Sequence, residues 1–97
     1  MDMYVILRRA GWRTAGDLEE AAARSKAEGD RTPDDIRWIR SYVVAEPTGE
    51  LGTVSIYEAS SPEAIRMHAE HAGLPVDEIV KVVDTVIVRP DPVPANA

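Results

Sequence analysis

The chain of 97 residues contains no cysteine, which excludes disulfides, thiolate metal sites and cysteine nucleophiles. It also lacks a long apolar run, since the stretch from Ile79 to Val88 is interrupted by Lys81 and Asp84. That stretch is well short of the roughly 20 apolar residues that a bilayer span needs, so we expect no membrane partner. Near the N-terminus no basic segment precedes an apolar core, as it would in a secretory signal, and we expect a cytoplasmic protein.

Basic side chains are too few to attract a nucleic acid. The 11 lysine and arginine residues are outnumbered by 17 aspartate and glutamate residues, and the net charge of -6 repels a phosphate backbone. Hydrophobic residues make up 44% of the chain and charged residues 29%, which is typical of a folded globular protein. The length allows one domain, which we place at residues 1–89, and we expect the proline-rich residues 90–97 to form a flexible tail.

Strand-favouring residues and helix formers alternate in the order strand, helix, strand, strand, helix, strand. Thr14 is expected to cap the first helix, and Gly29 is expected to end it. Either Ser60 or Ser61 caps the second helix, which ends at Gly73. The expected strands are residues 3–9, 36–45, 51–59 and 79–88, and the expected helices are residues 18–28 and 62–72.

One stripe of the first expected helix consists mostly of small side chains. A helix with such a stripe is expected to lie close to the surface that it covers. The residues of this stripe are Leu18, Ala21, Ala22 and Ser25.

The order of the elements predicts an α+β fold of the ferredoxin-like βαββαβ type, an antiparallel four-stranded sheet with two helices on one face. In the first strand, however, Val5 and Leu7 point to one face while Tyr4 and Ile6 point to the other, so both faces are apolar. Because two helices cannot cover both faces, we expect a homodimer of the dimeric α/β-barrel type, in which two sheets pack face to face. The alternative is that one set consists of ordinary scattered surface side chains.

The two histidines, His68 and His71, both lie on the second expected helix. A spacing of three residues places them within one turn, where both can reach one metal ion. The further ligands would be carboxylates such as those of Glu58, Glu70 or Asp77. The alternative is that His68 is a hydrogen-bonded, half-buried histidine that faces the sheet, and that His71 is solvated.

Glu58 follows Val54 and Ile56 along the third expected strand, so its carboxylate shares a face with aliphatic side chains. A buried carboxylate needs a polar partner, which predicts a small polar pocket between the sheet and the helices. The alternative is that Glu58 projects at the edge of the sheet, near the positive end of the second helix. The partners available for the pocket are His68, Arg8, Arg40 and Tyr42.

Two stretches, 36–43 and 57–79, resemble a family of small bacterial proteins of unassigned function. The resemblance covers most of residues 3–83. Its most specific part is the succession Tyr-Glu-Ala, His-Ala and Ala-Gly-Leu-Pro-Val-Asp within residues 57–79.

The resemblance implies a ferredoxin-like homodimer, and some members of the family are described as nickel-binding. It also implies that Glu58 and His68 occupy recurring polar positions of the family. His71 falls where a basic or variable residue is expected.

Two functions from different classes follow. The first is a small homodimeric binding protein that holds nickel or another divalent transition metal through His68, with Glu58 and His71. The second is a cofactor-free enzyme of the dimeric α/β-barrel type, in which His68 or Glu58 acts as an acid or base on a small organic molecule. A purely structural interaction module is a third possibility, because a fold alone does not choose among functions.

Overall fold

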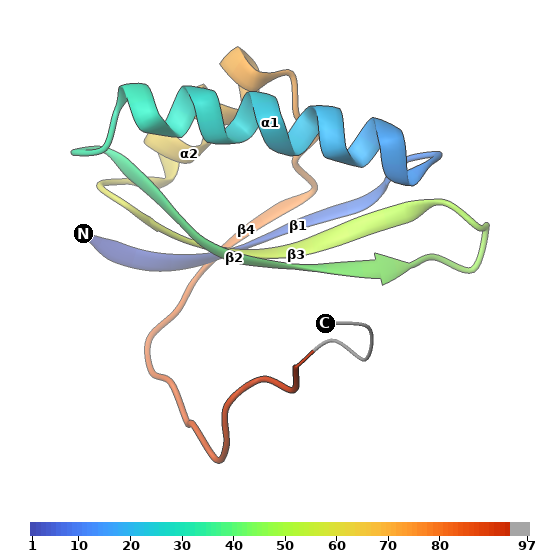
Figure 1. Cartoon of the computed structure of the whole chain (residues 1–97). Coiled ribbons are helices and arrows are strands. Elements are labelled where there is room, and N and C mark those ends of the chain that lie inside the picture. Colours follow the sequence, from blue (N-terminus) through green and yellow to red (C-terminus); the bar gives the residue numbers. More distant parts are fainter. Residues whose placement is uncertain (94–97) are drawn as a thin grey trace.

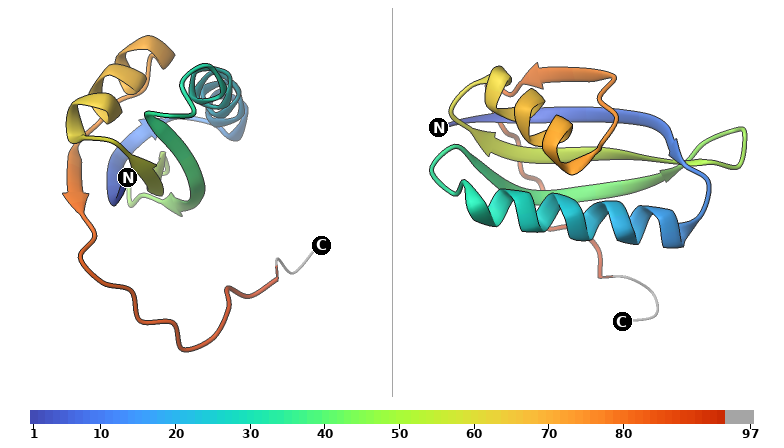
Figure 2. Two further views of the ribbon diagram at one scale, coloured as in Figure 1. Left: turned by 90° about the vertical axis from the view of Figure 1, so that its left-hand side faces the viewer. Right: turned by 90° about the horizontal axis from the view of Figure 1, so that it is seen from above.

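The computed structural model describes residues 1–93 and confirms the ferredoxin-like α+β fold (Figure 1). Its elements are β1 (Asp2–Trp12), α1 (Ala15–Arg31), β2 (Ile36–Ala45), β3 (Leu51–Ala59), α2 (Pro62–Ala72) and β4 (Glu78–Lys81). The strands form one antiparallel four-stranded sheet in the order β2-β3-β1-β4. Both helices lie on one face of the sheet, and α1 runs along β2 (Figure 2).

The start of α1 follows the expected cap, but its end does not. Thr14 Oγ1 accepts a hydrogen bond from the Asp17 N–H at 3.1 Å, as a helix N-cap does. The helix continues past Gly29, so the expected end at this residue was wrong. Gly29 keeps a helical backbone, and its carbonyl accepts the N–H of the C-cap residue Thr32 at 3.2 Å. A glycine ends a helix only where its backbone turns left-handed, which this one does not.

At α2 the structure decides between the two serines. Ser61 is the N-cap, because its Oγ accepts the Ala64 N–H at 3.1 Å and Pro62 then occupies the first helical position. The helix ends at Gly73, where φ of 69° places the backbone in the left-handed region, as expected.

β4 is much shorter than the expected strand over residues 79–88. It pairs antiparallel with β1, with Tyr4 opposite Lys81, and the Val82 N–H donates to the Met3 carbonyl at 2.8 Å. Val83 would lie opposite Asp2, the first residue of β1, so the apolar residues after Val83 have no part of β1 to pair with. Residues 82–93, which we call the C-terminal arm, pass beneath the sheet (Figure 1). Residues 94–97 of the expected flexible tail lie outside the described residues.

The core lies between the sheet and α2. Aromatic and aliphatic side chains from four elements meet there, with Val76 and Ile79 packed at their margin. The core residues are Tyr4, Ile6, Ile36, Tyr57, Ala59 and Ile65. In the described part of the chain, no helix is long and apolar enough to cross a membrane.

The other face of the sheet is covered by no helix, and we call it the free face (Figure 1). Its side chains alternate along each strand with those that point to the helices. Large apolar side chains dominate it, and Tyr42 and Val80 are exposed in the single chain. The apolar members of the free face are Met3, Val5, Leu7, Tyr42, Val44, Val54, Ile56 and Val80.

Gly52 lies where β3 approaches the irregular end of β1 most closely. A Cβ at this position would lie 2.6 Å from the Arg8 carbonyl oxygen and 2.7 Å from Glu46 Oε1. We expect Gly52→Ala to lower the free energy of unfolding by about 2 kcal/mol, because the backbone oxygen can move only by distorting the strand pairing. Urea unfolding measures this loss.

The matched control is Gly16→Ala in the first turn of α1. The added methyl group would meet Thr14 Oγ1 at an ordinary 3.8 Å, and alanine is the better helix former, so no loss is expected. A Gly52→Ala protein as stable as the control would contradict the close approach.

Candidate functional site

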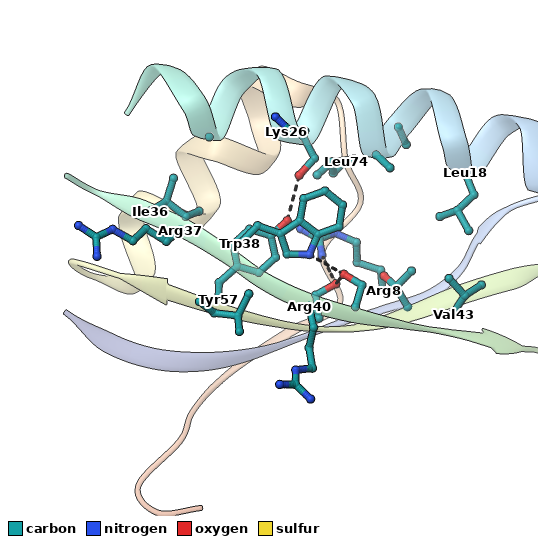
Figure 3. A pocket seen from close by; sticks show the side chains of 18 of the residues that line it. Arg8, Leu18, Lys26, Ile36, Arg37, Trp38, Arg40, Val43, Tyr57 and Leu74 are labelled. Carbon is teal, nitrogen blue, oxygen red and sulfur yellow. Dashed lines mark hydrogen bonds between the residues drawn. The ribbon is translucent and has the colours of Figure 1, made fainter. Parts of the chain in front are cut away.

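A cavity of about 740 Å³ lies between α1 and the helix-facing side of β2 and β3 (Figure 3). The small-residue stripe of α1 lines this cavity, and within the stripe Ser25 reaches the sheet, with its Oγ 2.9 Å from the Tyr57 hydroxyl. The strands opposite the stripe also carry short side chains, so neither wall fills the space between them. These short residues are Ala21, Ala22, Ser25 and Gly29 on the helix side, and Ser41, Thr53 and Ser55 on the sheet side.

Arg8 lies at the inner wall of this cavity with only 2% of its surface exposed. It follows Tyr4 and Ile6 on the helix-facing side of β1, so the strand alternation places its side chain inside. The guanidinium Nη1 donates to Ser55 Oγ at 3.3 Å, and Cζ lies 5.9 Å from the centre of the Tyr57 ring. The Nε and Nη2 atoms are buried and have no hydrogen-bond partner among the described residues.

Two serines connect Arg8 with Trp38. The Trp38 Nε1–H donates to Ser41 Oγ at 2.8 Å, and Ser41 Oγ lies 2.8 Å from Ser55 Oγ, which accepts from Arg8. Trp38 turns to the helix side at a β-bulge between Trp38 and Arg40, and its ring stacks on Tyr57 at 6.1 Å. The floor of the cavity is therefore a continuous polar network under aromatic rings.

Burial shifts the pKa of both ionisable groups in the cavity floor, Arg8 and Tyr57. It lowers the pKa of the Arg8 guanidinium, while the nearby Tyr57 hydroxyl opposes the change. It raises the pKa of Tyr57, while the hydrogen bond with Ser25 and the charge of Arg8 act in the opposite direction. An arginine stays protonated in such a site, so the cavity holds a positive charge and a neutral phenol.

His68 lies between α2 and α1, with 6% of its surface exposed, and does not line the cavity. Its Nε2 is 3.1 Å from Ser25 Oγ, which is in turn 2.9 Å from the Tyr57 hydroxyl. Its Nδ1 is buried and unpartnered within residues 1–93. Burial is the main cause that lowers the pKa of His68; Arg8 and His71 lower it further, and Glu28 opposes them.

His71 is exposed near the end of α2, where it lines a shallow surface hollow with Glu28, Arg31 and Thr32. This hollow adjoins His68, because a Cβ at Gly29, the residue after Glu28, would lie 3.7 Å from His68 Cε1, and His71 is one turn from His68 on α2. Glu28 was missed by the sequence analysis, since nothing in the pattern of α1 distinguishes it from the other acidic residues.

Glu58, Tyr42 and Arg40 do not join His68 and Arg8 in one pocket, which corrects the polar pocket expected between sheet and helices. Glu58 follows Tyr57, whose ring contacts His68 edge-on at 5.8 Å, so Glu58 points to the free face. Figure 3 shows the Arg40 side chain turning away from the cavity, although its strand position lines it.

On the free face, Arg40 and Tyr42 both bind a residue of the C-terminal arm. Arg40 Nη1 lies 2.6 Å from Asp91 Oδ2, and the Tyr42 hydroxyl donates to the same carboxylate at 2.9 Å. The expected ligands Glu58 and His68 therefore lie on opposite sides of the sheet. Within residues 1–93, no group of three or more histidine, aspartate or glutamate side chains stands ready to hold a metal ion.

Fold and site together define a ferredoxin-like α+β protein with a buried arginine in a helix–sheet cavity and a buried histidine beside it. The chain belongs to the SCO4226-like family, described as nickel responsive protein SCO4226-like, which matches residues 4–82. Among solved structures it is similar to SCO4226 from Streptomyces coelicolor A3(2), with a TM-score of 0.66 and 23% sequence identity. That match covers 87% of this chain and 99% of the other. No curated protein matches the chain.

The burial of His68 predicts a pH-dependent stability. Because its pKa is lowered in the folded chain, the unfolded chain binds the proton first as the pH falls below the ordinary histidine value of 6.5. His68 therefore contributes fully to the free energy of unfolding above that pH. This contribution is lost as the pH falls from there toward the pKa of His68 in the folded chain. We expect His68→Gln to flatten the fall in unfolding free energy below about pH 6.5 in urea titrations.

Met67→Gln is the matched control, because this position on the same helix is 60% exposed and the change removes no titrating group, so the wild-type slope should be kept. Equal slopes in wild type and His68→Gln would contradict a neutral, buried His68.

Proposed function

We propose that the protein is a small homodimeric binding protein that responds to nickel by binding it. The family to which the chain belongs is described as nickel responsive, which supports the choice of metal. The observation that carries the proposal is the buried Nδ1 of His68, unpartnered within residues 1–93, with His71 one turn along α2 and Glu28 in the hollow that His71 lines. Imidazole nitrogens with a carboxylate oxygen form a donor set that suits nickel.

The hydrogen bond of His68 determines which nitrogen can bind an ion. If the ring proton is on Nε2, Ser25 Oγ accepts it and the lone pair of Nδ1 is free. The lowered pKa of His68 keeps the ring neutral, so a cation does not have to displace a second proton. His71 is exposed and Glu28 is held only by a 3.6 Å contact with Arg31, so both side chains can turn toward His68.

In this proposal the carboxylate ligand is Glu28 and not Glu58. The ring of His68 and the carboxylate of Glu58 lie on opposite sides of the sheet, so one subunit cannot present both to one ion. Glu58 could take part only if a second copy met it across the free face.

We expect isothermal titration with nickel to show saturable binding to the wild-type chain. His68→Gln and His71→Gln should each weaken it at least about tenfold, which corresponds to ~1.4 kcal/mol, because each removes a nitrogen ligand. Glu28→Gln should also weaken binding, and Glu58→Gln is the matched control that should leave it unchanged. Loss of binding in Glu58→Gln alone, or equal affinity in both histidine variants and wild type, would remove the proposed ligands.

The free face supports the homodimer half of the proposal. It presents half-buried and exposed aliphatic and aromatic side chains on all four strands, and a contiguous apolar surface of this kind is typical of an interaction site. The arm below it adds further apolar side chains that are largely exposed in the described residues 1–93. Val83, Val86, Ile87 and Val88 are 79% to 91% exposed. A second copy would cover both surfaces at once.

We expect light scattering after size exclusion to give the mass of two chains at micromolar concentration. Ile56 lies at the centre of the free face, opposite Val5 and Arg40 on the neighbouring strands. Ile56→Glu should shift the protein to a single chain, because it places two like charges in an apolar contact. Met67→Glu, at a 60% exposed position on α2, is the control that keeps the dimer.

A wild-type chain that elutes as a monomer would contradict the dimer. An Ile56→Glu protein that remains dimeric would place the interface elsewhere.

A further inference from the structure

The cavity holds a positive charge without a negative partner. Arg8 is buried, yet in the described part of the chain it forms no ion pair. A buried charge is costly to keep unless it is paired. The contacts that remain, one hydroxyl of Ser55 and the face of Tyr57, leave part of the guanidinium without a bond.

The unsatisfied part of Arg8 has a defined shape. Its Nη1 donates to Ser55, whereas Nε and Nη2 have no partner. These two nitrogens form one edge of the planar guanidinium, and their N–H bonds run side by side. Such an edge matches the two oxygens of a carboxylate, each of which can accept one hydrogen bond.

The size and lining of the cavity indicate the chemistry of the rest of the ligand, beyond its carboxylate. Its volume of about 740 Å³ lies within the range of small-molecule sites. Large apolar side chains form the walls beyond the polar floor, which favours a hydrocarbon or aromatic body over a sugar or nucleotide. The large apolar lining residues are Trp12, Leu18, Ile36, Trp38, Ile39, Val43 and Leu74.

We infer that this cavity binds a small organic monocarboxylate with an apolar body, and that the Nε and Nη2 edge of Arg8 holds its carboxylate. A single negative charge balances the one buried guanidinium, because the other charged lining residues, Glu19, Lys26, Asp30, Arg37 and Arg40, are exposed to solvent. A second negative charge on the ligand would be left unpaired among apolar walls. This site shares no residue with the proposed nickel ligands, since His68 does not line it, and it lies on the helix side of the sheet, away from the free face.

Trp38 is the side chain that would admit the carboxylate. It lines the cavity with 38% of its surface exposed, and its indole N–H shares the Ser41 and Ser55 pair with Arg8. The two free nitrogens of Arg8 are themselves buried, so a ligand reaches them only if a neighbouring side chain moves. We expect that side chain to be Trp38, which is partly exposed and is joined to Arg8 through the two serines.

The probe that tests this site is 3-phenylpropanoate, and its neutral amide is the matched compound. The chain has two tryptophans, Trp12 and Trp38, and both line the cavity. In nitrogen-15 NMR spectra of the full chain, we expect 3-phenylpropanoate to shift both indole N–H signals saturably, with Kd at or below about 1 mM. We expect the amide to bind at least about tenfold more weakly, because it cannot form the charged pair.

Two arginine variants separate recognition from folding. Arg8→Met should abolish the preference for the carboxylate over the amide, and Arg8→Lys, which keeps the charge but lacks the paired edge, should weaken it. Arg40→Met is the control that should keep the preference, since the Arg40 side chain turns away from the cavity.

The inference would be overturned if 3-phenylpropanoate shifted neither indole N–H signal saturably. Equal affinity for acid and amide in the wild-type chain would also overturn it, and this comparison requires no variant to fold. A preference for the acid that survives in folded Arg8→Met would remove Arg8 as the anchor.

Discussion

The packing between the helices and the sheet depends on one buried, protonated guanidinium, that of Arg8. Arg8 lies on the same side of β1 as Tyr4 and Ile6, which come earlier in the strand and pack in the apolar core. Around it the neighbours become short and polar, among them Ser55 and Thr53. A charge surrounded by tightly packed aliphatic side chains would destabilise the fold, so the apolar core stays at the α2 end and a cavity opens under α1.

The bulge in β2 decides what each face of the sheet presents. It places Trp38 on the side of the helices, while the residues after it resume the alternation with Arg40 and Tyr42 on the free face. The same irregularity thus supplies an aromatic wall to the cavity and an arginine and a tyrosine to the opposite side, where Asp91 binds both. A regular strand would have put either the indole or the Tyr42 hydroxyl on the wrong face.

Local signals in the sequence predict the order of elements and most helix ends, because a cap such as Thr14 or Gly73 acts within one turn. Assembly of the site could not be predicted in the same way. Alternation shows that Glu58 shares a side with Val54 and Ile56, but it does not say which side the helices cover. The unpaired edge of Arg8 depends on its contact with Ser55, 47 positions further along the chain, and no sequence pattern predicts that contact.

Ser25 connects the two parts of the site, and its single proton restricts both. Its oxygen is bonded to Tyr57 and to His68, and the hydroxyl can donate to only one of them. When Nε2 of His68 carries the ring proton, Ser25 accepts it and donates to the Tyr57 oxygen, so the phenol proton turns toward the cavity. When Nε2 is bare, Ser25 donates to it and the phenol donates to Ser25. The state of the histidine nitrogen that faces an ion is therefore coupled to the polarity of the cavity floor beside Arg8.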